Sequence, residues 1–208
     1  MARFGITPAI PVLGVSLPEL RKLARELGKD HVLANKLWDT KIHEARTLAA
    51  LVEDPKQVTA KQMNAWVRDF QTWDLCDTVC GTLFDKTPYA YQKVMQWSAR
   101  KEEFVKRAAF ALIAWLAVHD KKADDNKFIK LFPIIKKCAT DDRNYVRKAV
   151  NWALRQIGKR NGNLRLQAIK LVKEISKIDS KAARWIAADA LRELNDPKII
   201  SMVAKRRL

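Results

Sequence analysis

The segment Trp73-Asp74-Leu75-Cys76-Asp77 places an aromatic ring and a carboxylate four residues apart. If both residues are helical, Trp73 and Asp77 share one face of the helix. A carboxylate beside an aromatic ring can stabilise a positive charge that develops in a transition state. A structural alternative explains the same residues: Asp74 as an N-cap, Asp77 as an N3 carboxylate favoured by the helix dipole, and Trp73 packed just outside the helix. The spacing is compatible with both interpretations.

A second candidate surface lies on the helix that we expect over residues 142–158. Its apolar residues fall on one side at 100° per residue and predict a core face. The opposite side carries a tryptophan among cations, at steps of 4, 3 and 4 residues: Lys148, Trp152, Arg155 and Lys159. Such a ring can pack on a sugar or a base while the cations hold phosphates. The alternative is that Trp152 packs against a neighbouring helix of the fold.

Arg107 and Arg184 stand near the starts of two further expected helices. Small residues, Ala111 and Ala114, follow Arg107 on its side of the helix and allow another backbone to approach closely. An arginine there can anchor a phosphate or pair with Asp77. A salt bridge between stacked helices is the structural alternative for Arg107. The same two interpretations, phosphate binding and a salt bridge, apply to Arg184.

The helices that must position these residues repeat along the chain. Val105–Ala109 returns as Val146–Val150 after 41 residues, and Ala153–Arg155 returns as Ala190–Arg192 after 37. A period of roughly 40 residues, with helices and no strand signal, is typical of HEAT-like helical pairs. We therefore expect an all-α fold, a HEAT-like helical-repeat solenoid with a concave basic groove.

Cap signals divide the chain into about a dozen helices with short connections. Ser16-Leu17-Pro18-Glu19 is a capping box, and Gly28 closes its helix. The next three helices have candidate N-caps in Asp30, Thr40 and Thr59. Further helices are expected over residues 88–98, 102–118, 125–139, 142–158, 163–177, 180–194 and 197–206. Residues 1–15 predict an irregular segment, and the absence of a linker predicts one HEAT-like repeat domain over 1–208.

Positive charge is concentrated in the C-terminal half of the sequence. Residues 1–100 hold 14 basic and 11 acidic side chains, residues 101–208 hold 26 and 12, and the net charge is +17. A one-sided excess is typical of polyanion binders, because release of counterions from phosphates drives association. Solubility alone explains this asymmetry poorly.

The cysteines and histidines indicate no metal site and no cofactor. Cys76, Cys80 and Cys138 contain no CxxC pair, and the three histidines lack metal-ligand spacing. Buried reduced thiols are expected. No apolar run reaches membrane length and the first residues form no signal peptide, so we expect an intracellular, cytoplasmic protein with no membrane partner.

These residues resemble motifs of the AlkD-like DNA alkylation repair glycosylases, a family of HEAT-like helical proteins. The resemblance begins at Gly14–Arg21 and continues to the final basic helices. It is most specific in three segments: Trp73–Asp77, Phe104–Ala109 and Lys148–Arg155. The resemblance implies four catalytic-site residues: Asp77 as the catalytic carboxylate, Trp73 and Trp152 beside the deoxyribose, and Arg107 in contact with DNA.

The function that the resemblance implies is excision of cationic N3- and N7-alkylpurines from duplex DNA by a monomeric glycosylase without a base-flipping pocket. A cationic purine is a good leaving group, so the protein need only stabilise an oxocarbenium-like sugar and position a water. Lys148, Arg155, Lys159 and Arg184 would bind the DNA backbone. One alternative is a non-catalytic HEAT-like protein that recognises distorted or branched DNA, and another is a scaffold for acidic proteins.

Overall fold

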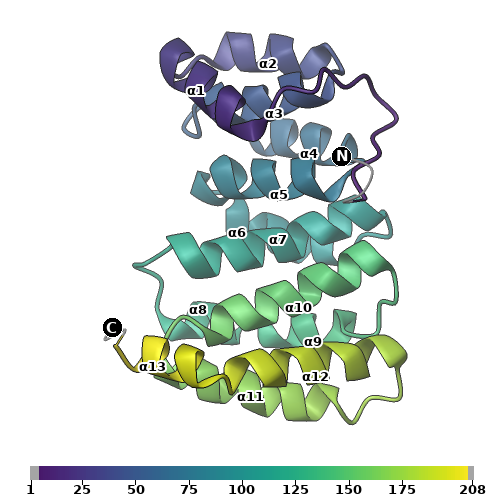
Figure 1. The fold of residues 1–208 in the computed structure, drawn as a ribbon, viewed down its shortest axis with the longest axis vertical. Coiled ribbons are helices and arrows are strands. Elements are labelled where there is room, and N and C mark those ends of the chain that lie inside the picture. The colour runs from purple at the N-terminus through teal and green to yellow at the C-terminus, as the bar shows by residue number, and fades with distance from the viewer. Residues whose placement is uncertain (1–4, 206–208) are drawn as a thin grey trace. The chain divides into compact units, whose positions relative to one another are not determined.

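The computed structural model describes residues 5–205, and over that range the chain forms helices, turns and irregular segments but no strand (Figure 1). This confirms the all-α prediction. The chain divides into two compact units, residues 1–93 and residues 94–208, called here the N-terminal unit and the C-terminal unit. The single domain over residues 1–208 and its concave basic groove stay predictions. None of the described helices is long and apolar enough to cross a membrane.

The N-terminal unit is built around α3, which packs against α1, α2 and α5. The indole rings of Trp38 and Trp66 stack in its core, with nearly parallel planes and ring centroids 3.9 Å apart. Its helices are α1 (Leu17–Leu27), α2 (His31–Asp39), α3 (His43–Val52), α4 (Ala60–Arg68) and α5 (Trp73–Thr82), followed by the short 3-10 helix η2 (Phe84–Lys86). The next helix, α6 (Ala90–Ser98), begins in this unit and ends in the other.

The first helix boundaries follow the sequence closely. Ser16 donates from its backbone N and its Oγ to Glu19 Oε2, at 2.9 and 2.6 Å, which completes the expected capping box. Gly28 ends α1 with a φ of +74°, a conformation that glycine adopts without strain. Asp30 caps α2 by accepting from Leu33 N at 2.9 Å.

The predicted N-cap at Thr40 is wrong, whereas the one at Thr59 is confirmed. The Thr40 hydroxyl donates to Leu37 O at 2.7 Å, so it terminates α2. Helix α3 begins at His43 instead, directly after Ile42. Thr59 Oγ1 accepts from Gln62 N at 3.1 Å and caps α4 as expected.

The segment before α1 is irregular over residues 5–16, as predicted for residues 1–15, and residues 1–4 lie outside the described range. A buried carboxylate holds it in place. Glu44 on α3 accepts from Leu13 N at 2.9 Å and from Gly14 N at 2.8 Å. The segment is therefore fixed to the helix that organises the N-terminal unit.

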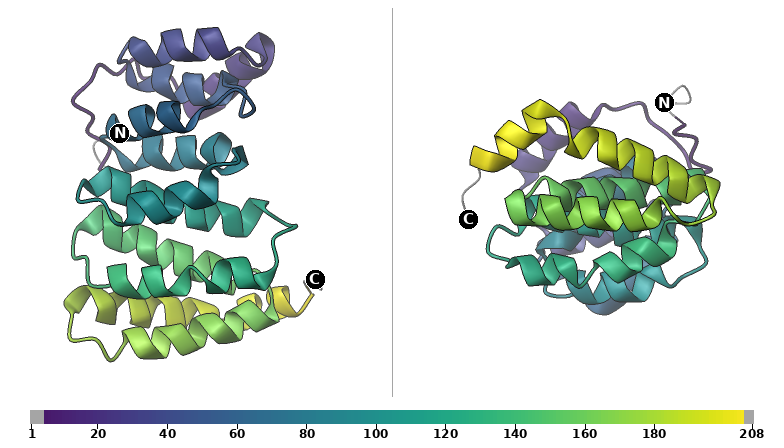
Figure 2. Two further views of the ribbon diagram at one scale, coloured as in Figure 1. Left: turned by 180° about the vertical axis from the view of Figure 1, so that it is seen from behind. Right: turned by 90° about the horizontal axis from the view of Figure 1, so that it is seen from below.

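The C-terminal unit is organised by α10, which packs against α7 on one side and α12 on the other (Figure 1). Helices α9 and α11 form a second layer behind them (Figure 2). The helices are α7 (Glu103–His119), α8 (Asp125–Ile129), α9 (Phe132–Cys138), α10 (Asn144–Gly158), α11 (Gly162–Ile175), α12 (Lys181–Leu194) and α13 (Pro197–Lys205).

Three details of this unit show how the sequence determines the packing. The helix expected over residues 125–139 is divided after Ile129, because Pro133 in the first turn of α9 has no N–H to donate to the preceding turn. The predicted core face of α10 is confirmed, since its apolar residues from Val146 to Ile157 are buried. At Gly158, a Cβ would lie 2.7 Å from Leu194 Cδ2, so glycine permits this close approach of α10 and α12.

Candidate functional site

Helix α5 brings Trp73 and Asp77 onto one face. The helix begins at Trp73, so both residues are helical and stand about one turn apart, as the functional interpretation requires. Both side chains are partly exposed. Thr72 occupies the N-cap position, and Asp77 is the fifth residue of the helix. The alternative with Asp74 as N-cap and Asp77 at N3 is therefore wrong.

The neighbouring carboxylate, Asp74, has a different environment. Its Oδ2 lies 2.8 Å from Nε2 of His43, a side chain that is only 3% exposed. Burial raises the pKa of the Asp74 carboxyl, but hydrogen bonds from His43 and neighbouring donors outweigh it, so the pKa lies below its ordinary value. This pair joins α3 to α5. Asp74 thus serves the packing that positions Asp77.

Arg107 is buried on helix α7, most of whose residues are apolar. Its side chain is 6% exposed, and its Nη1 donates to Tyr145 O at 2.7 Å. The guanidinium thereby adds a hydrogen bond to a carbonyl in the first turn of α10. The predicted DNA contact of Arg107 stays a prediction, and the structure adds a role in joining α7 to α10.

Trp152 packs on a neighbouring helix and is also partly exposed. Its ring meets that of Trp115 on α7 edge to face, with centroids 5.5 Å apart and planes at 83°. Trp115 in turn stacks on His119, with centroids 5.0 Å apart. The alternative prediction, that Trp152 packs against a neighbouring helix, is therefore confirmed. Part of the side chain is nevertheless exposed.

Arg155 and Lys159, the last two cations of the surface predicted on α10, belong to a regular series of side-chain pairs with α12. We call this series the α10–α12 ladder. Its polar rungs begin with Asn151 Nδ2, which donates to Asp189 Oδ2 at 2.6 Å. Arg155 then bonds Glu193, and its Nη1 lies 3.5 Å from Asp189 Oδ2. One turn later, Lys159 Nζ lies 2.6 Å from Glu193 Oε1. At the other end, Arg147 Cζ lies 4.6 Å from the centroid of the Trp185 ring.

The ladder changes the interpretation of the candidate surface predicted from Lys148, Trp152, Arg155 and Lys159. Arg155 and Lys159 are partly buried and paired with a carboxylate. Burial raises the pKa of Glu193, but the bonds from Lys159 and Arg155 outweigh it and hold the pKa below its ordinary value. Phosphate binding by Arg155 and Lys159 stays a prediction, and it requires exchange of Glu193 for phosphate. Lys148 is exposed.

Arg184, the last predicted DNA-binding residue, lies in the first turn of α12 with a side chain that is 55% exposed. Its Nη1 lies 2.9 Å from Oδ1 of Asp179, which is fully exposed. Pairs of this kind contribute little to stability and are readily screened by salt. Its predicted role stays a prediction.

Comparison with known proteins places the chain in a family. The sequence matches the family model described as "DNA alkylation repair enzyme" over residues 1–194. The chain belongs to this DNA alkylation repair family.

A solved structure described as a new family of proteins related to the HEAT-like repeat DNA glycosylases, with affinity for branched DNA structures, matches with a TM-score of 0.76 at 20% identity. The match covers 99% of this chain and 92% of that one. A designed armadillo repeat protein matches at 17% identity with a TM-score of 0.38, covering 85% of this chain and 92% of that one. No curated protein matches the chain. The HEAT-like fold predicted from the repeat is thus confirmed.

Several partners of the predicted residues in this family member were not predicted from the sequence, among them Trp115, Asp189 and Glu193. Trp115 is eight residues after Arg107 on the same side of α7, and continuing the four-residue step past Ala111 reaches it. Asp189 and Glu193 were not found, because their partners lie on a different helix. A separation of 38 residues, close to the repeat, relates each of these carboxylates to its partner on α10.

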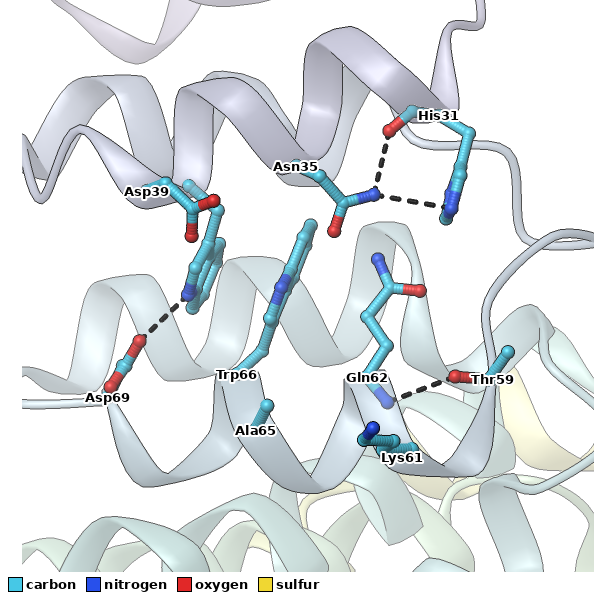
Figure 3. Close-up of a pocket in the computed structure, with 10 residues that line it drawn as sticks. His31, Asn35, Asp39, Thr59, Lys61, Gln62, Ala65, Trp66 and Asp69 are labelled. Atoms are coloured by element: carbon cyan, nitrogen blue, oxygen red, sulfur yellow. Dashed lines mark hydrogen bonds between the residues drawn. The ribbon is translucent and has the colours of Figure 1, made fainter.

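Two cavities lie in the N-terminal unit of this family member. One, of about 530 Å³, is lined by His43, Glu44 and Asp74 beside α5. The other, of about 470 Å³, lies between α2 and α4, where the Trp66 ring, Asn35 and Gln62 point toward one another (Figure 3). No predicted site residue lines the second cavity. Among its lining residues, Trp38 Nε1 on α2 donates to Oδ2 of Asp69, at the end of α4, at 2.8 Å.

The cysteine thiols are buried, and their surroundings affect the pKa values of Cys80 and Cys138. Cys76, Cys80 and Cys138 are buried thiols outside any disulfide, as expected. Burial raises the pKa of Cys80 well above its ordinary value and also raises that of Cys138. Within residues 5–205, no group of three or more His, Cys, Asp or Glu side chains is arranged to hold a metal ion.

Proposed function

We propose that this DNA alkylation repair family member is a glycosylase that hydrolyses the N-glycosidic bond of cationic N3- and N7-alkylpurines in duplex DNA. The observation that carries the proposal is the pairing of Trp73 and Asp77 on one partly exposed face of α5. Asp74, the carboxylate beside them, is held by His43. We therefore assign the chemistry to Asp77. Asp74 is assigned to packing, because its contact with His43 fixes helix α5.

The proposed chemistry uses the charge that alkylation leaves on the purine. The bond between C1′ of the deoxyribose and the purine nitrogen breaks, and its electron pair leaves with the base, which becomes neutral. Asp77 stabilises the positive charge that develops on the sugar, while Trp73 packs against it. Water then adds to C1′ and releases a proton to solvent. The products are a free alkylpurine and an abasic site in the DNA.

In this proposal the C-terminal unit binds the DNA. Residues 94–208 hold 27 basic and 12 acidic side chains, a net charge of +15, which favours association with phosphates. Trp152 contacts the sugar, and Arg107 contacts the backbone at the lesion. Four further cations contact the flanking backbone: Lys148, Arg155, Lys159 and Arg184.

A second candidate function is recognition of branched DNA without excision. The observation that favours it is the solved relative with affinity for branched DNA structures, which shares the fold at 20% identity. Both candidates require DNA binding by the basic surface, so binding to DNA does not separate them. Release of a free base does.

The deciding experiment incubates the protein with duplexes that carry one N7-methylguanine or one N3-methyladenine. The proposal predicts that free methylated base and abasic sites accumulate well above the spontaneous rate. Release at the spontaneous rate, together with tighter binding to a four-way junction than to a duplex of equal length, would contradict the glycosylase and support the second candidate.

A further inference from the structure

The α10–α12 ladder contains one rung that differs in chemistry from the others. Three of its pairs are separated by the same 38 residues: Arg147–Trp185, Asn151–Asp189 and Arg155–Glu193. In the second and third pairs the residue on α12 is a carboxylate: Asp189 accepts from Asn151 and lies 3.5 Å from Arg155 Nη1, and Glu193 pairs with Arg155. In the first pair it is an indole, which carries no formal charge. The positive charge of Arg147 is therefore retained at the surface.

The ring rather than a carboxylate holds the Arg147 guanidinium in place. Arg147 Cζ lies 4.6 Å from the Trp185 centroid, within the range of a cation–π contact. The Arg147 Nε is buried and has no hydrogen-bond partner among the described residues. Trp185 nevertheless remains 37% exposed, which is unusual for so large an aromatic side chain. One cation is thus fixed on a ring that still presents surface to solvent.

The exposed surroundings of Trp185 on α12 are basic. Arg184 precedes it, and Arg192 follows about two turns later on a similar side of the helix, with 55% and 79% of their side chains exposed. Their carboxylate partners are Asp179 and Asp189. Because the Arg184–Asp179 pair is exposed on both sides, it is weak and screened, and a phosphate can replace the carboxylate there. The largely exposed guanidinium of Arg192 can also donate to a phosphate. The surface therefore combines a fixed ring with cations that can exchange partners.

We propose that the Trp185 platform, defined as Trp185, Arg147, Arg184 and Arg192, binds an unpaired base of DNA. The inference rests on DNA as the partner in the proposed function. Inside a duplex, both faces of each base are covered by neighbouring bases, so only an unstacked base offers a face to an indole. The arginines bind the phosphates beside that base. Because every base has a π face, binding by the platform is tolerant of sequence.

The test compares two DNAs that differ in a single unpaired base. One is a perfect duplex, and the other is the same duplex with a one-base 2-aminopurine bulge. The wild-type protein binds the bulged DNA more tightly, and stacking on the indole quenches the 2-aminopurine fluorescence. Trp185→Ala weakens binding to the bulged DNA by about five- to a hundredfold, the loss expected for one base–aromatic stack. The same variant loses the quenching and leaves the perfect duplex much less affected.

Two further variants keep the test decisive. Trp185→Phe keeps an aromatic face and retains part of the preference. Leu166→Ala removes another exposed apolar side chain, 63% exposed on α11, and leaves the preference unchanged. Thermal melting confirms that each variant is folded.

Retention of both the bulge preference and the quenching by Trp185→Ala would overturn the platform while leaving the glycosylase untouched. Loss of base release from alkylated duplex in the wild-type protein, with the platform behaviour intact, would overturn the glycosylase alone. If the wild-type protein bound neither DNA, both proposals would fall.

Discussion

The two units of the molecule differ in what their charges do. The N-terminal unit holds 13 basic and 11 acidic side chains, a net charge of +2, whereas the C-terminal unit holds 27 and 12, a net charge of +15. The candidate catalytic carboxylate, Asp77, belongs to the nearly neutral unit. The expected phosphate ligands, including Lys148 and Arg184, belong to the basic one. The attraction of DNA is thus assigned to the C-terminal unit, whereas the carboxylate proposed for the chemistry belongs to the N-terminal unit.

A second difference lies within the charged groups themselves. In the N-terminal unit, Asp74 and Asp77 occupy one helix, yet His43 holds the first in the packing and the second is partly exposed. In the C-terminal unit, Glu193 compensates Arg155, whereas Lys148 is exposed. Net charge therefore does not identify functional groups. The partner of each group must be known.

The largest effect on the C-terminal unit is expected from Arg107→Ala. This change removes a charge-assisted hydrogen bond to Tyr145 O, which joins α7 to α10. Urea unfolding should show a loss of about 1.5–3 kcal/mol in unfolding free energy. An unchanged midpoint with weakened DNA binding would mean that Arg107 acts on DNA and contributes little to the fold.

Trp152→Ala should have a smaller effect on stability and a large one on excision. The edge-to-face pair with Trp115 is worth about 0.5–1.5 kcal/mol beyond burial of area. Trp115→Ala is the matched control, because it breaks the same pair but leaves the Trp152 ring present. Melting curves and base-release rates are compared for both variants. A stability loss of about 3–5 kcal/mol in Trp152→Ala would instead mark a fully structural residue.

Glu193→Gln should strengthen DNA binding by releasing Arg155 and Lys159 from the ladder. If both cations then contact phosphates, the slope of log K against log salt becomes steeper by up to about 1.8, or roughly 0.9 for each. Glu174→Gln is the control, since it removes the same charge and releases Lys136 on the exposed surface of α9 and α11. Equal slopes in the wild type and Glu193→Gln would show that the ladder stays closed on DNA.

The smallest effect is expected from Lys148→Ala, which tests a cation that is already exposed. Loss of one phosphate contact should flatten the salt slope by roughly 0.9 and leave thermal stability unchanged. Lys170→Ala removes an exposed lysine from α11 and should leave the slope as in the wild type. If the two variants behave alike, the DNA surface of this unit does not include Lys148.

The sequence predicted the helical fold because each relevant signal is local. The capping box at Ser16 and the core face of α10 depend on residues within one or two turns. The break at Pro133 was missed because apolar residues continue through it. The partners of the site residues are not local: His43 and Asp74 are 31 residues apart, and Arg155 and Glu193 are 38 apart. Periodicity within one helix gives the direction of a side chain, but the group that it meets belongs to another helix.

The central claim, that Asp77 carries the chemistry and Asp74 the packing, is tested most directly by comparing Asp77→Asn with Asp74→Asn. Single-turnover release of N7-methylguanine from duplex DNA is measured beside DNA affinity and thermal stability. Asp77→Asn should slow release by about a hundred- to a thousandfold and keep or tighten binding, because the amide removes electrostatic stabilisation but preserves shape. Asp74→Asn should lower stability, through its bond to His43, and retain release when folded. Release by Asp77→Asn near the wild-type rate would contradict the account.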